Sequence, residues 1–151
     1  MFFYALVGAV VFLDQASKFL ALKLLSPPIS VPVIPNVLDL TLVMNPGVAF
    51  GLFSGYAPIL FTVITASLVF LFVLANRSHG EASRETSRLS RWALSLILGG
   101  AVGNWIDRLR FSAVVDFIDF RVWPVFNIAD CAITVGVGLY LLHIFQSKDP
   151  S

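Results

Sequence analysis

Four long apolar stretches constrain the fold of this 151-residue chain more than any other feature of its sequence. Each has about the 20 mostly apolar residues that a helix needs to cross a bilayer. The stretches run over roughly residues 2–25, 57–75, 92–111 and 124–145. Hydrophobic residues make up 58% of the chain and charged residues only 13%, which fits a protein surrounded partly by lipid. We therefore predict an all-α polytopic membrane protein, a single domain over residues 1–151 with four transmembrane helices.

The distribution of arginine and lysine predicts how the chain is oriented in the membrane. Residues 76–91 contain four arginines, whereas residues 26–56 contain no Lys or Arg. Connections on the cytoplasmic side carry the excess of these residues. We therefore place the 76–91 connection and both termini in the cytoplasm, and the first and third connections outside. The first apolar stretch has no basic start and no A-x-A cleavage pattern, so we expect it to be retained as a helix.

The first outer connection is more than a linker. Residues 29–44 are rich in Val, Ile, Leu and Pro, a composition that favours short strands with the prolines at edges or turns. We expect a small extracytoplasmic β-rich element over about residues 29–56, lying on the outer membrane surface.

Several function classes lack support in the sequence. The net charge is +1 and no basic patch is interleaved with aromatic residues, so we expect no nucleic-acid partner. His79 and His143 are the only histidines, and no HExxH, Walker or GxGxxG pattern occurs. A histidine-rich metal site is therefore not expected.

The polar residues within the apolar stretches gather at one depth. At 1.5 Å per residue, Asp14 and Asn104 lie roughly 18 Å above the inner ends of their helices, and Asp130 lies roughly 9 Å below the outer face. Other polar residues share these faces at helical spacing, namely Lys18, Asp107, Arg108 and Asn127. Because unpaired charge in lipid is costly, these groups should face one another inside the bundle, and such a cluster is a candidate functional site.

Two carboxyl groups in this cluster could activate a water molecule. When two carboxylates lie close together, repulsion raises one pKa, so that the pair holds one proton near neutrality. The ionised member can then take a proton from water while the protonated member supports a substrate carbonyl. Asp116 lies in the third connection and Asp130 near the start of the fourth stretch. A reversal of the chain between them would bring the two acids together at the membrane surface.

Each of these residues also has a structural interpretation. Asn127 and Asp130 are typical capping residues for the fourth helix. Asp14 and Lys18 are spaced as a buried ion pair that stabilises the bundle, and for them the structural role is favoured. Arg108 could extend its side chain outward. The glycines between Gly99 and Gly103 indicate close helix contact rather than ligand binding.

The sequence also contains residues that other chemistries or other classes of protein would use. A cysteine mechanism at Cys131 needs a nearby histidine base, and His143 is about 18 Å further along the helix. A Ser–Lys dyad could use Ser17 or Ser112, but Asp14 already engages Lys18. A metal-dependent hydrolase would lack histidine ligands. An ion-coupled transporter could use Asp14, Lys18, Asp107 and Arg108 as a relay, yet the inner halves of the helices are nearly free of polar residues that could continue it.

Five short elements resemble one known family, the lipoprotein signal peptidases, also called signal peptidase II. In chain order they are DQASK (14–18), NPGVAFG (45–51), GNWIDR (103–108), VVDF (114–117) and FNIAD (126–130). Each element is weak by itself, but their order and their placement on four spans make the resemblance specific. Pro46 and Val48 depart from the commonest residues of the second element.

The resemblance implies a role for each residue of the cluster. It implies that Asp116 and Asp130 are the catalytic dyad. It implies that the site is lined by Asn45, Asn104, Arg108 and Asn127, and that it is supported by Asp14, Lys18, Gly47 and Asp107.

The resemblance also implies an activity and a location. Members of the family are aspartic endopeptidases that remove the signal peptide of bacterial prolipoproteins, cleaving before a diacylglyceryl-modified cysteine. They work in the cytoplasmic membrane among its lipids, with the site near the extracytoplasmic face. They need no cofactor, and cyclic peptides of the globomycin type inhibit them.

Overall fold

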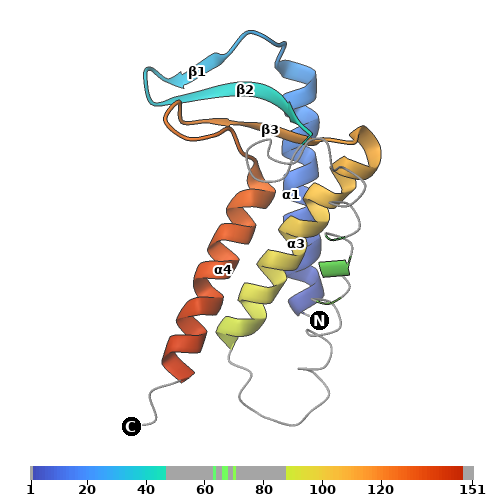
Figure 1. The fold of residues 1–151 in the computed structure, drawn as a ribbon, viewed down its shortest axis with the longest axis vertical. Coiled ribbons are helices and arrows are strands. Elements are labelled where there is room, and N and C mark those ends of the chain that lie inside the picture. The colour runs from blue at the N-terminus through green and yellow to red at the C-terminus, as the bar shows by residue number, and fades with distance from the viewer. Residues whose placement is uncertain (1, 47–62, 64–65, 68–69, 71–87, 148–151) are drawn as a thin grey trace.

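The computed structural model describes residues 2–46, 63, 66–67, 70 and 88–147 (Figure 1). In chain order the elements are helix α1 (Phe2–Leu24), strands β1 (Val31–Ile34) and β2 (Leu38–Asn45), helix α3 (Arg88–Phe111), strand β3 (Val114–Asp119) and helix α4 (Ile128–Ser147). Three of the four predicted spans are thus helices. The predicted span over residues 57–75 lies almost entirely outside the described residues.

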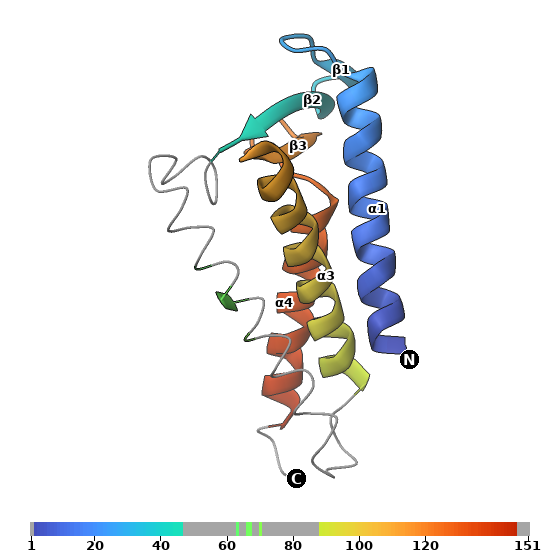
Figure 2. The same ribbon diagram turned by 90° about the vertical axis from the view of Figure 1, so that its right-hand side faces the viewer.

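The three long helices stand side by side, and the sheet lies across one end of them (Figures 1 and 2). By length and composition, two described helices are apolar enough to cross a membrane, α1 and residues 128–146 of α4. Helix α3 has 24 residues but carries arginines at both ends and Asp107 near its C-terminal end. The fourth helix begins at Ile128 rather than at Pro124, because residue 126 still pairs with β3.

The outward surface of the helices is apolar. In α1, Phe12 is 71% and Phe19 is 55% exposed, and in α4 Phe145 is 67% exposed. The polar residues Asp14 and Lys18 are instead buried on the inward face of α1. This pattern is the reverse of that in a water-soluble protein and suits helices whose outer surface contacts lipid.

Glycines allow the helices to approach closely. A Cβ at Gly99 would lie 2.8 Å from Cβ of Val10, and a Cβ at Gly103 would meet the carboxylate of Asp14. The pairs Gly99–Gly103 and Val10–Asp14 are each four residues apart, so one face of α3 packs along one face of α1. Gly136 brings α4 close to Ala93 of α3 in the same way. The predicted role of the glycines in helix contact is confirmed.

The sheet is antiparallel, with the order β1-β2-β3. Strands β1 and β2 lie within the predicted β-rich element, but β3 falls where we predicted a loop, and that prediction was wrong. The β2–β3 ladder shifts register between Leu40 and Val43. An apolar cluster of Ala21, Leu25 and Phe117 joins the sheet to α1.

Candidate active site

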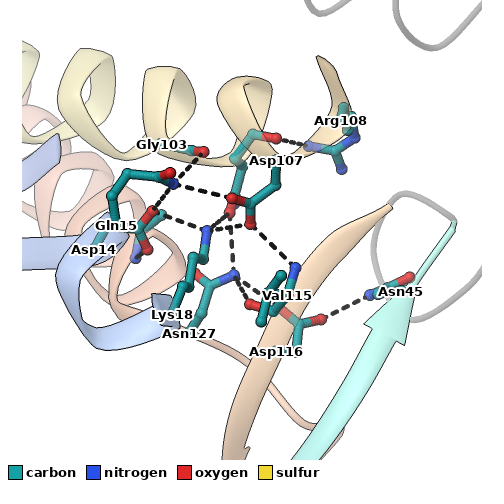
Figure 3. Close-up of polar contacts among 12 residues, drawn as sticks. Asp14, Gln15, Lys18, Asn45, Gly103, Asp107, Arg108, Val115, Asp116 and Asn127 are labelled. Carbon is teal, nitrogen blue, oxygen red and sulfur yellow. Dashed lines mark hydrogen bonds and ion pairs between the residues drawn. The ribbon is translucent and has the colours of Figure 1, made fainter. Parts of the chain in front are cut away.

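A buried ion cluster lies between α1 and α3, just below the sheet (Figure 3). The ammonium of Lys18 lies 2.8 Å from a carboxylate oxygen of Asp14 and 2.8 Å from one of Asp107. All three side chains are at most 2% exposed. Lys18 also donates a hydrogen bond to Oδ1 of Asn104 at 2.9 Å. The expected Asp14–Lys18 ion pair is therefore present, and it includes a second carboxylate.

Gln15 is a member of this cluster that the sequence reasoning missed. Its Nε2 lies within hydrogen-bond distance of Asp107 at 2.9 Å, and of Asp14 and the Gly103 carbonyl at 3.2 Å each. A signal was available, because Gln15 is an uncharged polar residue inside an apolar stretch, three positions before Lys18. Gln15 therefore links the same two carboxylates that Lys18 contacts.

Asp107 connects the ion cluster to the sheet. Its Oδ2 accepts a hydrogen bond from the backbone N–H of Val115 at 3.1 Å. The carbonyl of Val115 accepts one from Nδ2 of Asn127 at 3.2 Å. Side chains therefore satisfy the backbone N–H and carbonyl of Val115, the residue before Asp116, on the outer edge of β3. This arrangement holds Asp116 toward the helices.

Asp116 is 2% exposed and accepts two side-chain hydrogen bonds. Asn127 Nδ2 donates to its Oδ1 at 2.7 Å, and Asn45 Nδ2 donates to its Oδ2 at 3.0 Å. Burial raises the pKa of the Asp116 carboxyl to about 6, and the nearby charge of Asp130 acts in the same direction, while the two amides oppose the rise. Asp116 can therefore gain or lose its proton near neutral pH.

Asp130 lies in the first turn of α4 and is half-buried. Its Oδ1 accepts a hydrogen bond from Asn104 Nδ2 at 2.8 Å. Its Oδ2 accepts one from the backbone N–H of Asn127 at 3.3 Å, and its own N–H donates to Oδ1 of Asn127 at 3.0 Å. This reciprocal pair is a capping box. The capping interpretation is therefore correct, and the same cap also reaches Asp116.

The orientation of both amides follows from their neighbours. An ammonium only donates, so Lys18 requires Oδ1 of Asn104 to face it, which turns Nδ2 toward Asp130. The N–H of Asp130 likewise requires Oδ1 of Asn127, which turns Nδ2 of Asn127 toward Asp116. Fixed N–H donors therefore face both acids, and Asn127 touches each of them.

The remaining candidates are placed differently. Arg108 is half-buried and donates to the carbonyl of Asn104 at 3.1 Å. Gly47 lies outside the described residues. Ser17 donates to the carbonyl of Asp14 at 2.8 Å, so its hydroxyl is engaged within its own helix. Within the described ranges no group of three or more His, Cys, Asp or Glu side chains could hold a metal ion.

Apolar helices around a buried polar network, capped by a small sheet, define a membrane protein with an acidic site. The sequence model of the family described as signal peptidase (SPase) II matches residues 6–146. The chain therefore belongs to the signal peptidase II family, which makes it a peptidase that removes signal peptides from prolipoproteins.

Individual relatives agree with this assignment. A lipoprotein signal peptidase from Halothermothrix orenii is 40% identical over 147 residues, covering 96% of each chain. One from Moorella thermoacetica is 47% identical over 135 residues, covering 89% of this chain and 87% of the relative. A solved structure described as a bacterial membrane enzyme has a TM-score of 0.79 at 30% identity, covering 99% of this chain and 92% of its own.

Proposed function

We propose that this peptidase is of the aspartic type and that Asp116 and Asp130 are its catalytic pair. One observation carries the proposal: a single residue, Asn127, hydrogen-bonds both carboxyls, one from β3 and one from α4. The two acids thus lie around a common point where the helices meet the sheet. A water molecule held between them would be the nucleophile.

The two acids differ in a way that assigns them different roles. Asp116 is nearly fully buried and has a pKa of about 6, so it is the member that holds the shared proton. Asp130 is half-exposed and lies in the first turn of α4, where the helix N-terminus favours a negative charge. Asp130 therefore takes the proton from water, while protonated Asp116 donates a hydrogen bond to the scissile carbonyl.

The hydrolysis balances with these two groups alone. Water loses a proton to Asp130 and adds its oxygen to the carbonyl carbon, and Asp116 protonates the carbonyl oxygen. When the C–N bond of the resulting diol breaks, the proton on Asp130 passes to the leaving amine and a diol proton returns to Asp116. No metal or organic cofactor is required for this sequence.

The substrate we propose is a prolipoprotein cleaved before its diacylglyceryl-modified cysteine. In this proposal Asn45, which hydrogen-bonds Asp116, and Arg108 bind the substrate backbone or the polar part of its lipid. Globomycin-type cyclic peptides would compete for the same place. Gly47 belongs to the same proposed lining.

We further propose that residues 1–151 form one domain in the bacterial cytoplasmic membrane. Helices α1, α3 and α4 and residues 57–75 would cross the bilayer among its lipids, with both termini in the cytoplasm. The arginines of residues 76–91 support this orientation through the positive-inside rule. The sheet and the acids then lie near the extracytoplasmic face, at the level of the lipid-modified cysteine.

The test is cleavage of a lipidated precursor by the purified protein in lipid, comparing the parent with Asp116→Asn and Asp130→Asn. Each variant should bind substrate and lose at least about 10³-fold in kcat, since each lacks one half of an acid–base pair that acts as a unit. Cleavage by both variants at the parental rate would eliminate the dyad. EDTA should leave the parental rate unchanged.

A further inference from the structure

A second polar cluster lies at the far end of the sheet from the acids, outside all five family-like elements. Both Nε and Nη2 of Arg121 donate to Oδ2 of Asp39, at 2.9 and 2.8 Å. The backbone N–H of Arg121 donates to Oδ1 of Asp119 at 2.7 Å, and Thr41 donates to the other oxygen of Asp119 at 2.9 Å. Asp39 and Asp119 are cross-strand partners. Arg121 therefore offsets the repulsion of two carboxylates that face each other across the ladder.

Arg121 has a backbone conformation that a non-glycine residue rarely adopts. Its φ is 62°, in the left-handed region. The N–H of Val122 donates to the carbonyl of Phe120 at 2.7 Å, which makes a three-residue γ-turn centred on Arg121. A γ-turn with positive φ is strained and persists only where its surroundings hold it. The contacts with Asp39 and Asp119 supply that restraint.

The contact between Arg121 and Asp39 leaves one buried polar atom of Asp39 unpaired, which costs free energy. The side chain is buried at 6% exposure, and its Oδ1 has no hydrogen-bond partner among the described residues. Burying such an oxygen is unfavourable. A half-exposed arginine pair would by itself stabilise the fold little. The pair is therefore better explained by what it positions than by what it adds to stability.

The turn lies between the two proposed catalytic acids in the chain. Phe126 returns to pair with Ile118, and its carbonyl accepts hydrogen bonds from the N–H groups of Phe117 and Ile118 at 3.0 and 2.8 Å. Asp116 comes just before this closed loop, and Asn127 comes just after it. The shape of the loop therefore sets how far Asn127 and the start of α4 lie from Asp116.

Strand β2 contacts both Asp116 and the turn at Arg121. Asn45 binds Asp116, while Asp39 binds Arg121. Asp39 and Asn45 are six residues apart and would share one face of a regular strand. The register shift between Leu40 and Val43 inserts an extra residue, so the two side chains point to opposite faces. One strand thereby positions the acid on one face and the turn on the other.

We propose that Arg121 is a positioning residue, which through Asp39 and Asp119 fixes the turn that sets the separation of Asp116 and Asp130. This inference rests on the proposed function, because it assigns the two acids a joint task. Arg121 itself does not contact the reacting atoms.

The experiment compares Arg121→Ala, Arg121→Gly and Asp39→Asn in cleavage of a lipidated precursor in lipid vesicles. Arg121→Ala and Asp39→Asn should lower kcat about 10- to 100-fold with KM within twofold, because misplacement by about an ångström has effects of this size. The basic limb of the kcat/KM profile should move to lower pH, since a more distant Asp130 raises the pKa of Asp116 less. Arg121→Gly adopts the turn without strain and should recover most of the rate.

The matched control is Lys23→Ala, which removes an exposed cation that lies over the ring of Phe19 near the outer end of α1. It should leave the rate and the pH profile unchanged. Equal losses in the Ala and Gly variants with an unshifted pH limb would show only a loss of folded enzyme and would overturn the inference. So would parental kinetics in Arg121→Ala. If Arg121→Ala does not fold, Asp39→Asn tests the inference by the same criteria, because asparagine has the same shape as aspartate.

Failure of this inference differs from failure of the proposed function. If Asp116→Asn is inactive while the Arg121 and Asp39 variants match the parent, only the positioning role is lost. If Asp116→Asn cleaves at the parental rate, the dyad itself is wrong.

Discussion

The structure holds two sets of buried carboxyls, and they are satisfied in different ways. Asp14 and Asp107 lie against the ammonium of Lys18 at 2.8 Å. Asp116 and Asp130 instead accept hydrogen bonds from uncharged amide groups. Both kinds of contact favour the charged form of a carboxylate, and an adjacent cation favours it more strongly than an uncharged amide does. We propose that the same residue type serves structure in the first set and acid–base chemistry in the second.

The two sets are joined, and the connection explains why both are needed. Lys18 orients the amide of Asn104, and Asn104 donates to Asp130. Asp107 anchors the backbone of Val115 beside Asp116. The first set thus fixes the geometry of the proposed catalytic pair. This division predicts opposite effects when charge is removed from one set or from the other.

The largest effect on stability should come from Lys18→Met. Removing the ammonium that lies against both Asp14 and Asp107 leaves two buried carboxylates facing each other, and breaking a buried pair costs about 3–5 kcal/mol. Thermal unfolding in mixed lipid–detergent micelles should show a large fall in the midpoint. A parental midpoint would mean that the ion cluster is not what holds α1 to α3.

Asp116→Asn should have the opposite effect and stabilise the folded protein at neutral pH. The folded pKa of about 6 lies above the ordinary 3.8, so the folded protein binds this proton more tightly than the unfolded chain does. The contribution of Asp116 to stability is fully present below pH of about 4 and falls as pH rises to about 6. The variant should escape this loss, up to about 3 kcal/mol. Unfolding midpoints measured from pH 4 to 8 would contradict this if the variant tracked the parent throughout.

A smaller effect is expected from Gly103→Ala. The added Cβ would meet the carboxylate of Asp14 and push α1 from α3, and overpacking of this kind costs about 1–3 kcal/mol. Gly138 is the matched control, because a Cβ there meets nothing within 4 Å. Gly138→Ala should therefore unfold at the parental midpoint. Equal midpoints for both variants would argue against close packing at the ion cluster.

The comparison also shows what the sequence could and could not predict. The first set was visible because Asp14 and Lys18 are local neighbours on one helix, and helical spacing places Asp107 at the same depth. The capping pattern at Asn127 and Asp130 is equally local. Three long helices followed from apolar length alone, and two of them are long and apolar enough to cross a membrane.

Strand β3 was missed because its partner is distant in the chain. Its six residues, VVDFID, are not joined to a neighbouring strand by a recognisable turn sequence. They pair instead with β2, about 70 residues earlier in the chain. The connection of Asp107 to the backbone of Val115 depends on that pairing. The positive φ of Arg121 likewise has no sequence signal, since it arises from contacts with Asp39 and Asp119.

The smallest effect should come from Asn45→Ala, which tests the amide side of the comparison. The hydrogen bond from Asn45 favours ionised Asp116, so its loss should raise the pKa of that carboxyl further. If Asp116 acts in its protonated form, the basic limb of kcat/KM should move to higher pH, by up to about one unit, since one unit is worth 1.36 kcal/mol. This shift is opposite to the one expected for Arg121→Ala. The two variants therefore distinguish the loss of a hydrogen-bond donor to Asp116 from an increased distance between the two acids. If instead the acidic limb of Asn45→Ala moved to higher pH, Asp116 would act as the base, and the roles of the two acids would be exchanged.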